Sequence, residues 1–314
     1  MKKNFACFDI GGTFIKYAII DERGGIYEKG KIETPVKNQK VEILHHICEI
    51  IRELEKNYDI YSVGISSCGL IDSERGEVIF SANIPGYSGT KIVDYIYKAT
   101  GYTAVIENDV RSACIGERWK GAGAEKENII LLTLGTGIGS GIIIDGKMLQ
   151  GANGLAGEVG HMTIVHNGEE CGCGGKGCYE RYASTSALIR QYKKASLSQG
   201  IEIDKITGEE IIDRINNGEQ LAKYVYEQFL QYVVTGLVNI THMFNPELII
   251  IGGGIAEQGE IFLRQIQERF QQAIMDIYQK KTHIVLAALH NDAGLYGACY
   301  LALSRWEKEH LHVN

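Results

Sequence analysis

The sequence predicts an α/β protein with two related halves, and three observations support this class. Short apolar runs alternate with amphipathic helical patterns along most of the chain. The segments CFDIGGTFIKYAIID (7–21) and LTLGTGIGSGIIID (132–145) share one plan: an apolar strand, a glycine and threonine turn, a second strand and an aspartate. A length of 314 residues suits two domains, since a domain usually holds about 100–200 residues.

The first half is predicted to begin with strands over 4–10 and 14–21, because both runs are apolar and rich in β-branched or aromatic residues. A third strand is expected over 26–34. A helix over 40–57 follows from the apolar face formed by Val41, Leu44, Ile47, Cys48, Ile51 and Leu54. The remaining elements expected in this half are a strand at 60–65, a helix at 90–100, a strand at 103–107 and a helix at 109–119.

The second half repeats the opening, with strand-like runs at 128–134 and 141–145 on either side of a glycine loop. Helical periodicity then dominates from about 185 to 243. The last predicted elements are a strand at 247–251, a helix at 257–280, a strand at 283–288 and a helix at 292–308.

Composition excludes several classes of protein. The net charge of −7 gives no broad basic surface, so neither nucleic acid nor an anionic membrane is an expected partner. The uncharged stretch 128–144 has glycine and threonine at its centre, which argues against a membrane span. Asp9 interrupts the apolar run that a signal peptide would need. Eight cysteines without such a signal indicate a reducing compartment, and we expect a cytoplasmic protein.

The glycine loop at 134–141 does not fit the common nucleotide motifs. A dinucleotide fingerprint would require glycine where Ser140 stands and a helix after the loop. A P-loop would require a lysine that is absent. A strand–turn–strand loop can still bind an anion through its backbone N–H groups and through the hydroxyls of Thr136 and Ser140. An ordinary tight turn is the alternative, and the matching loop at 11–13 favours phosphate binding.

Two carboxylates are candidates for phosphoryl-transfer chemistry. Asp109 stands between a strand and a helix, so it is either a helix N-cap or a general base that takes the proton of a hydroxyl substrate. Asn108 could orient the same substrate. Asp9, beside the first glycine loop, could hold Mg²⁺ or could be a buried turn carboxylate.

A cysteine cluster predicts a structural zinc site. Cys171, Cys173 and Cys178 with one histidine form a Cys₃His set, which leaves no open position for catalysis. His161 is the expected fourth ligand, and His166 is the alternative. The metal would also fix Glu158 and Glu180 near one point, where carboxylates could bind a polyhydroxylated ligand. On their own, these two glutamates would be read as solvated surface residues.

Taken together, these segments resemble the ROK family of sugar kinases over nearly the full length. The resemblance rests on DIGGTFIK (9–16), NIPGY (83–87), IENDV (106–110), LGTGIGSG (134–141), LAGEVGHM (155–162), IIIGGGI (249–255) and AGLYGA (293–298). The segment CGCGGKGCYE (171–180) matches the family's C-x-C-G-x-x-G-C-x-E zinc motif at every fixed position.

The resemblance implies an actin-like (RNase H-like) two-domain ATPase fold with an interdomain cleft. It places one domain at 1–118 plus 299–314 and the other at 119–298. It also implies a homodimer and an ATP-dependent hexose kinase, with glucose phosphorylated at the 6-hydroxyl. N-acetylmannosamine, N-acetylglucosamine, fructose, allose or a β-glucoside are alternative substrates. A sugar-responsive repressor of the same family is disfavoured, because only eight residues precede Asp9 and a helix-turn-helix would not fit there.

The resemblance also carries residue roles onto this sequence. Asp109 would be the catalytic base, and His161 would ligate zinc through one ring nitrogen and meet the sugar through the other. The implied sugar ligands are Asn83, Asn108, Asp109, Glu158, His161 and Glu180. ATP and its Mg²⁺ would be bound by Asp9, Gly11, Gly12, Thr13, Lys16, Gly135, Thr136, Gly137, Gly253 and Gly254.

Some positions depart from the family pattern. Ser67 and Cys68 stand where the family usually has x-P, Val110 and Arg111 follow Asp109 where Ala-Asn is usual, and Ser140 replaces a glycine. None of these changes removes a catalytic group. The first two border the sugar segment, so they leave the identity of the sugar open.

Overall fold

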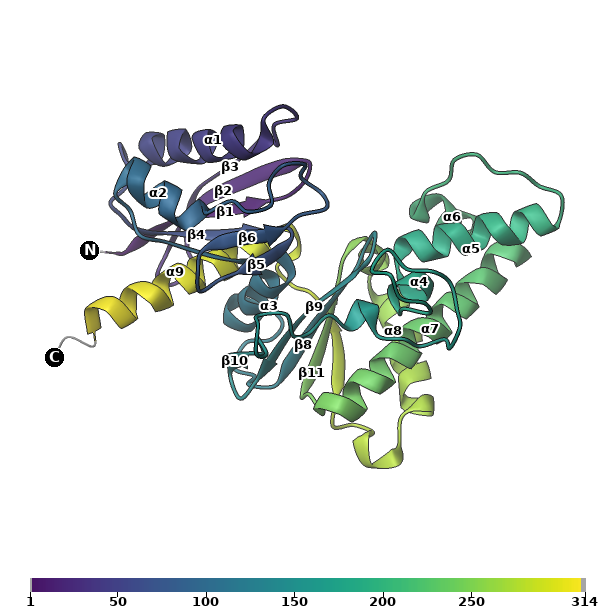
Figure 1. Cartoon of the computed structure of the whole chain (residues 1–314). Coiled ribbons are helices and arrows are strands. Elements are labelled where there is room, and N and C mark those ends of the chain that lie inside the picture. Colours follow the sequence, from purple (N-terminus) through teal and green to yellow (C-terminus); the bar gives the residue numbers. More distant parts are fainter. Residues whose placement is uncertain (1, 312–314) are drawn as a thin grey trace. The chain divides into compact units, whose positions relative to one another are not determined.

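The computed structural model describes residues 2–311, and the chain divides into two compact units (Figure 1). Unit 1 comprises Met1–Glu125, Met148–Ala156 and Ala288–Asn314, and unit 2 comprises Lys126–Lys147 and Gly157–Ala287. The boundaries expected from sequence, 118 and 299, differ from these by several residues. The structure also assigns the short segment 148–156 to unit 1, which no sequence pattern indicated.

Unit 1 is built on a five-stranded sheet in the order β3–β2–β1–β4–β7. Strands β1 (Asn4–Ile10), β2 (Phe14–Asp21) and β3 (Ile26–Glu33) form an antiparallel meander, and β4 (Ile60–Ser67) and β7 (Ala104–Asn108) run parallel to β1. Strands β5 (Leu70–Asp72) and β6 (Glu77–Phe80) form a separate hairpin that the sequence did not predict. Because β1, β4 and β7 are parallel, their carboxyl ends bring Asp9, Ser66 and Asn108 to one edge of the sheet.

Helices cover both faces of this sheet (Figure 1). Along β1, Phe8 and Ile10 enter the core that includes α1 (Gln39–Leu54) and α2 (Ile92–Thr100), whereas Phe5 and Cys7 enter the core that includes α9 (Ala293–Leu311). Burial on both faces explains why the sequence of β1 is apolar without a clear alternation.

Close packing between α3 (Asp109–Lys120) and α9 depends on glycine. A Cβ atom at Gly116 would lie 2.2 Å from the carbonyl oxygen of Ala293, and one at Gly297 would lie 1.8 Å from that of Ser112. These glycines therefore let α9 pack backbone to backbone against the helix that carries Asp109.

Unit 2 contains a second five-stranded sheet with the same plan as the first. Its order is β10 (Lys147–Met148), β9 (Ile138–Ile144), β8 (Ile129–Leu134), β11 (Leu248–Gly252) and β12 (His283–Leu286). Strands β8 and β9 are antiparallel, whereas β11 and β12 run parallel to β8. The repeat seen in the sequence is therefore a repeated sheet, and each glycine turn joins two antiparallel strands as predicted.

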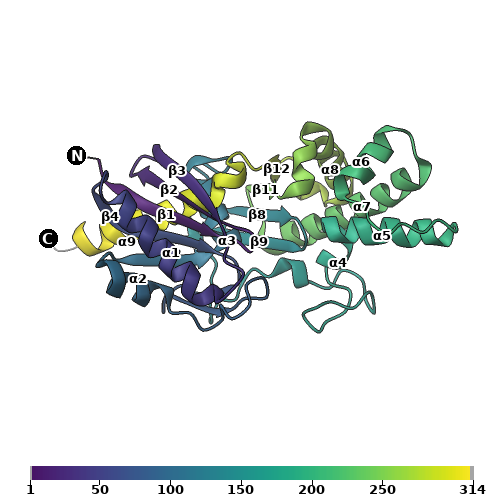
Figure 2. The same cartoon turned by 90° about the horizontal axis from the view of Figure 1, so that it is seen from above.

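The long helical stretch of unit 2 is divided into several helices (Figure 2). Helix α7 packs against α4, α5, α6 and α8. The helices are α4 (Glu180–Ala183), α5 (Thr185–Ser198), α6 (Gly208–Asn216), α7 (Gln220–Phe244) and α8 (Glu260–Ala273), with short 3₁₀ turns η1 (Val159–His161), η2 (Gly254–Gln258) and η3 (Asp276–Tyr278) in unit 2 and η4 (His290–Asp292) in unit 1.

The single helix predicted over 257–280 is wrong. Gly259 has φ +67° and ψ −142°, which a helix cannot continue through, so α8 begins only after it. At the other end Ile274 is extended and buried, which directs its side chain into the core and ends α8 at Ala273. The apolar period continues in the sequence beyond the point where the backbone leaves the helix.

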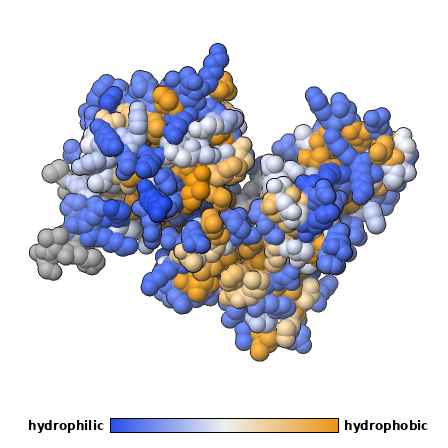
Figure 3. Space-filling model, in the orientation of Figure 1, coloured by the Kyte–Doolittle hydropathy of each residue, from blue (hydrophilic) through white to orange (hydrophobic). Residues whose placement is uncertain are grey.

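Hydrophilic residues cover much of the face seen in Figure 3, with hydrophobic residues in separate groups. No helix in the described part of the chain is both long enough and apolar enough to cross a bilayer.

Candidate active site

The first glycine loop lies next to a charged cluster. Asp9, the residue before the last of β1, pairs with Lys16 on β2, and Lys16 Nζ lies 3.1 Å from Asp9 Oδ2. Ser66 at the end of β4 donates a hydrogen bond of 2.7 Å to Asp9 Oδ1. Lys16 Nζ also donates to the carbonyl oxygen of Asn291 at 3.0 Å. Sheet register thus gathers Asp9, Ser66 and Lys16, although the sequence pointed only to the first and the last.

The turn Gly11–Thr13 is held by a neighbouring strand end. Thr34 donates its hydroxyl to the Gly11 carbonyl oxygen at 2.7 Å and its N–H to the Thr13 carbonyl oxygen at 2.9 Å. A Cβ atom at Gly12 would lie 3.5 Å from the carbonyl oxygen of Asn83, so this turn lies beside the segment that carries Asn83. The Asn83 side chain is exposed and available to a ligand.

Asp109 is the first residue of α3, and Asn108 is its N-cap. The Asn108 side chain accepts hydrogen bonds from the N–H groups of Val110 (3.0 Å) and Arg111 (3.1 Å). Its amide nitrogen donates to Asp109 Oδ1 at 2.8 Å and to the Gly69 carbonyl oxygen at 3.0 Å. The capping role that the sequence left open for Asp109 therefore belongs to Asn108, and the Asp109 carboxylate is not needed to start the helix.

The environment of Asp109 makes it a stronger base. Removal from water raises the pKa of Asp109 to about 6, and the nearby negative charge of Asp9 acts in the same direction. The hydrogen bonds from Val110 and Asn108 lower the pKa and offset part of this rise. A carboxylate with such a pKa is ionised at neutral pH and still basic enough to accept a proton from a reacting hydroxyl.

The second glycine loop is the tight turn Gly135–Gly137 between β8 and β9. The N–H of Gly135 donates to the Gly137 carbonyl oxygen at 3.0 Å, and the N–H of Thr185 donates to the Gly135 carbonyl oxygen at 2.8 Å. Gly253, just past β11, has φ +89°, and a Cβ atom there would lie 2.5 Å from the Leu134 carbonyl oxygen. Gly135, Thr136, Gly137, Gly253 and Gly254 are thus grouped at the carboxyl ends of β8 and β11.

The four predicted metal ligands converge. The ligand atoms of His161, Cys171, Cys173 and Cys178 all lie within 4.8 Å of one another, and His166 is not part of this cluster. Cys173 Sγ lies 3.6 Å from Cys178 Sγ, and Cys171 Sγ lies 3.7 Å from His161 Nδ1. Tetrahedral zinc with sulfur ligands about 2.3 Å away separates its ligand atoms by roughly these distances. The residues therefore fit a zinc ion in both chemistry and spacing.

Glu158 and Glu180 flank this cluster. Glu158 is the exposed residue that begins the 3₁₀ turn η1, and the N–H of His161 donates to its carbonyl oxygen at 3.1 Å. Glu180 Oε1 lies 3.1 Å from Cys171 Sγ and 3.8 Å from His161 Nδ1. A Cβ atom at Gly137 would lie 2.6 Å from Glu180 Oε2, so this carboxylate lies directly against the second glycine turn.

Ser140 does not belong to the turn. It lies within β9, where its hydroxyl donates to the carbonyl oxygen of Gly157 and lies 3.5 Å from the N–H of Val159. The hydroxyl thus joins β9 to the segment around Glu158. The sequence analysis counted Ser140 as part of the glycine loop, either as a phosphate contact or as part of a tight turn. The structure instead places Ser140 inside β9.

Comparison with known proteins identifies the family. A family model described as "ROK family" matches residues 5–305.

The chain belongs to the ROK family.

Among characterised relatives, glucokinase of Thermotoga maritima is 34% identical over 305 residues, which cover 95% of this chain and 96% of that protein. A ROK family glucokinase from Streptomyces griseus, solved with glucose and AMPPNP, has a TM-score of 0.80 and 32% identity and covers 96% of this chain and 99% of that one. ROK hexokinase from Thermus thermophilus has a TM-score of 0.85 and 28% identity and covers 98% of this chain and 100% of that one.

These findings confirm the predicted family, the α/β fold of the actin-like type and the class of ATP-dependent sugar phosphotransferase. They leave the hexose open. The predicted residue roles stay predictions, supported by the geometry described above.

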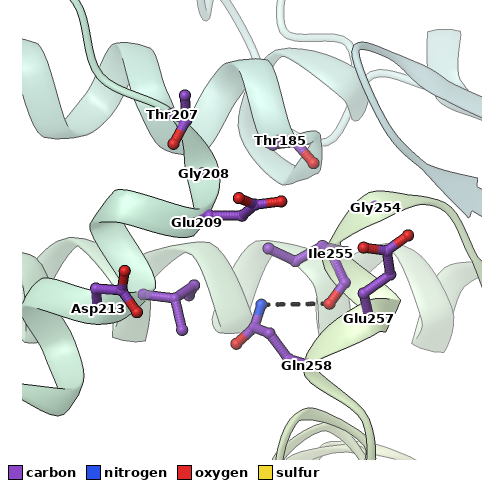
Figure 4. Close-up of a pocket in the computed structure, with 10 residues that line it drawn as sticks. Thr185, Thr207, Gly208, Glu209, Asp213, Gly254, Ile255, Glu257 and Gln258 are labelled. Atoms are coloured by element: carbon purple, nitrogen blue, oxygen red, sulfur yellow. Dashed lines mark hydrogen bonds between the residues drawn. The ribbon is translucent and has the colours of Figure 1, made fainter.

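This ROK kinase has a cavity in unit 2, and most of the residues that line it were not predicted as site residues from sequence. It has a volume of about 490 Å³ and is lined by Thr185, Thr207, Gly208, Glu209, Ile212, Asp213, Gly254, Ile255, Glu257 and Gln258. In Figure 4 residues of α6 and the turn before it face the η2 segment, where Gln258 Nε2 donates to the Ile255 carbonyl oxygen at 3.2 Å. Only Gly254 was predicted. The T-x-x-E capping box at Thr207 and Glu210 could have located the start of α6.

Proposed function

We propose that this ROK kinase transfers the γ-phosphoryl group of ATP to the 6-hydroxyl of a hexose, with glucose as the first substrate to test. The observation that carries the proposal is the Asp109 carboxylate, which sits at the start of α3 with a pKa raised to about 6 and with its Oδ1 fixed by Asn108. The glucokinases described above support glucose over other hexoses.

In the proposed reaction Asp109 accepts the proton of the attacking hydroxyl. The sugar oxygen forms a bond to the γ-phosphorus as the bond between this phosphorus and the β,γ-bridging oxygen breaks, and ADP leaves with the bridging oxygen. The proton on Asp109 then passes to solvent. Such a reaction needs little covalent chemistry from the protein beyond alignment, charge neutralisation and this base.

The proposed sugar ligands are Asn83, Asn108, Glu158, His161 and Glu180. His161 Nδ1 faces Cys171 and is the nitrogen that fits the metal, which leaves Nε2 for a sugar hydroxyl. Carboxylate oxygens of Glu158 and Glu180 would accept hydrogen bonds from further hydroxyls.

We assign the phosphate oxygens of ATP to the glycine turns Gly11–Thr13 and Gly135–Gly137, with Lys16 as a charged contact. The proposed donors are the N–H groups of Gly12, Thr13, Thr136 and Gly137, because those of Gly11 and Gly135 donate to carbonyl oxygens within their own turns. The nucleoside is assigned to the cavity beside Gly253 and Gly254, where Glu209 and Glu257 offer acceptors to hydroxyls and Ile255 offers an apolar wall. Asp9 carries the oxygen ligands that Mg²⁺ prefers, and the ion would neutralise phosphate charge.

The Cys₃His cluster is proposed to hold a structural zinc ion. The ligands lie on the turn that carries His161 and on the glycine-rich segment 171–178. Zinc bound by four protein ligands would fix that segment, and with it His161 and Glu180, but would have no open position for substrate.

The decisive experiment is a coupled ADP-release assay with glucose, mannose, fructose, allose, N-acetylglucosamine and N-acetylmannosamine. We expect the highest kcat/KM with glucose. The Asp109→Asn variant should lose about 10²–10⁴-fold in kcat while it still binds the sugar. Activity of this variant close to the wild type would remove Asp109 as the base, and turnover of none of the sugars would remove the proposed function.

Two further expectations accompany the proposal. We predict a homodimer, which light scattering coupled to size-exclusion chromatography would test directly. We also predict a cytoplasmic location, which fractionation of cells would test.

A further inference from the structure

Arg111 is a buried charge for which the proposed chemistry gives no role. It lies on α3 two residues after Asp109, and only 6% of its surface is exposed. A guanidinium group in such a place must be paired, because an isolated buried charge is costly.

One partner of Arg111 is the buried carboxylate of Glu107. Arg111 Nη1 lies 3.7 Å from Glu107 Oε1, and this same oxygen accepts a hydrogen bond of 2.8 Å from the N–H of Asn108. Burial raises the pKa of Glu107, and the charge of Arg111 and the N–H of Asn108 lower it. Glu107 therefore supports the backbone directly before Asp109, and Arg111 balances its charge.

The second partner is a surface loop of the same unit. Arg111 Nη2 donates a hydrogen bond of 2.8 Å to the carbonyl oxygen of Ala156. The N–H of Ala156 donates in turn to the carbonyl oxygen of Gln150 at 3.0 Å, which closes residues 150–156 into a loop. Residues 151–153 of this loop are exposed. Ala156 precedes Glu158 by two residues, and Glu158 is a proposed sugar ligand.

The loop and Arg111 also share a polar cavity. Its volume is about 330 Å³, and its lining includes Asp72, Arg75, Arg111, Gln150 and Asn153. Arg75 is a useful contrast, because its side chain is 77% exposed and its ion pair, 3.7 Å long, is with Asp72, three residues earlier in the same turn. Arg111 is thus the cavity's buried arginine that connects two separate segments of chain.

We propose that Arg111 is a positioning residue for sugar binding: its guanidinium group ties the turn that carries Asp109 to the carbonyl oxygen of Ala156 and so fixes where the chain enters the Glu158 segment. This inference rests on the proposed function. A planar guanidinium can serve Glu107 and Ala156 at once with different nitrogens, whereas a lysine ammonium is a single point on a flexible stem.

The test compares three variants of the full-length protein with the wild type. Arg111→Met removes the charge and the donors at similar volume, Arg111→Lys keeps the charge, and Glu107→Gln/Arg111→Met removes both charges. For Arg111→Met we expect KM for the hexose to rise about 10-fold or more, as the loss of a charged hydrogen bond implies, while KM for ATP stays within about twofold. Hydrogen exchange in peptides covering 148–158 should become faster.

The double variant separates positioning from charge balance. It should recover the melting temperature lost in Arg111→Met, because no buried carboxylate is left unpaired, yet its hexose KM and its exchange in 148–158 should stay as high as in Arg111→Met. Arg111→Lys should likewise keep its fold and leave the hexose KM raised. Arg75→Met is the matched control on the same cavity and should change neither quantity.

Three results would overturn the inference: recovery of the hexose KM in the double variant, a parallel rise in the KM for ATP, or unchanged exchange at 148–158 in Arg111→Met. The exchange measurement needs no catalysis, so it tests the loop contact even if no sugar is turned over. A wild type that phosphorylates no hexose would refute the proposed function, whereas an active wild type with a normal Arg111→Met variant would refute this inference alone.

Discussion

At the residue scale, Asn108 and Asp109 have different roles although they are adjacent: one caps a helix and the other is the proposed base. A residue between a strand and a helix can cap the helix or act on substrate, and the sequence allowed both for Asp109. The structure gives the cap to Asn108, whose side chain receives the N–H groups of Val110 and Arg111. Asp109 is left half-buried beside Asp9, where its pKa rises to about 6.

This pKa predicts the acid limb of the activity profile. Protonation removes the base, so kcat/KM should fall about tenfold for each pH unit below the pKa of Asp109, which is about 6. Initial rates measured from about pH 8 down to about pH 5 would show this limb. A profile that stays level through this range would contradict the assignment, provided that circular dichroism shows the protein folded throughout.

The same shift predicts how stability depends on pH. Because the pKa of Asp109 is raised from 3.8 to about 6 on folding, its protonated form favours the folded state below pH 3.8, and this contribution is lost as pH rises through about 6. The Asp109→Asn variant should therefore unfold at higher denaturant concentration than the wild type at pH 7–8. This advantage should shrink as pH falls toward about 4. Urea titrations at several pH values would test this, and a difference that does not change with pH would speak against it.

At the scale of elements, glycines fix the short segments that carry the site. The turns at 11–13 and 135–137 each connect antiparallel strands, and the segment 171–178 folds back on itself with Gly174 and Gly177 at positive φ. A Cβ atom at Gly177 would lie 1.8 Å from the Val165 carbonyl oxygen, whereas one at Gly174 meets nothing within 4 Å. Only Gly174 therefore has room for a Cβ atom, although both glycines have a similar positive φ that strains any other residue.

This contrast gives a matched pair for the zinc segment. Elemental analysis should find about one zinc ion per wild-type chain. Gly177→Ala should lose most of the metal and melt at a lower temperature, because the backbone must move away from Val165. Gly174→Ala has a similar φ and should retain zinc, with a cost of about 1 kcal/mol from the strained φ alone. Equal zinc contents in the two variants would show that the close contact at Gly177 does not shape the site.

At the scale of the whole molecule, two units repeat one sheet plan and each carries part of the proposed chemistry. Unit 1 contains Asp9, Asn83 and Asp109, and unit 2 contains Glu158 and the Cys₃His cluster. A ligand that binds the folded protein and not the unfolded chain raises the free energy of unfolding, by an amount set by its concentration relative to its Kd.

Ligand and metal dependence follow from this organisation. A non-hydrolysable ATP analogue with Mg²⁺ at about 100 times its Kd should raise the free energy of unfolding by about 2.7 kcal/mol. Omission of Mg²⁺ should abolish turnover, and chelation of Mg²⁺ by EDTA should do so within the dead time of the assay, before a closed zinc site releases its metal. Calorimetry and the ADP-release assay would provide both measurements, and full turnover without Mg²⁺ would contradict the role given to Asp9.

Most of the fold was readable from sequence because the strands that build it are short, apolar and separated by glycine turns. The hairpin β5–β6 was missed since LID and EVIF are too short to stand out from a loop. The break in the helix predicted at 257–280 was missed because burial of Ile274 outweighs local helical preference, and burial is a property of the packed protein.

The family, the repeated strand–glycine–strand plan, the candidate base and the candidate metal ligands all follow from sequence alone, since they depend on residue types at fixed spacing. Tertiary structure decided which neighbours those residues have. Asn108 caps α3, and Ser66 and Lys16 both donate hydrogen bonds to Asp9. The Ser140 hydroxyl donates to the carbonyl oxygen of Gly157, and the Arg111 guanidinium donates to that of Ala156. Such contacts link residues from different segments, and only the packed backbone brings those segments within hydrogen-bonding distance.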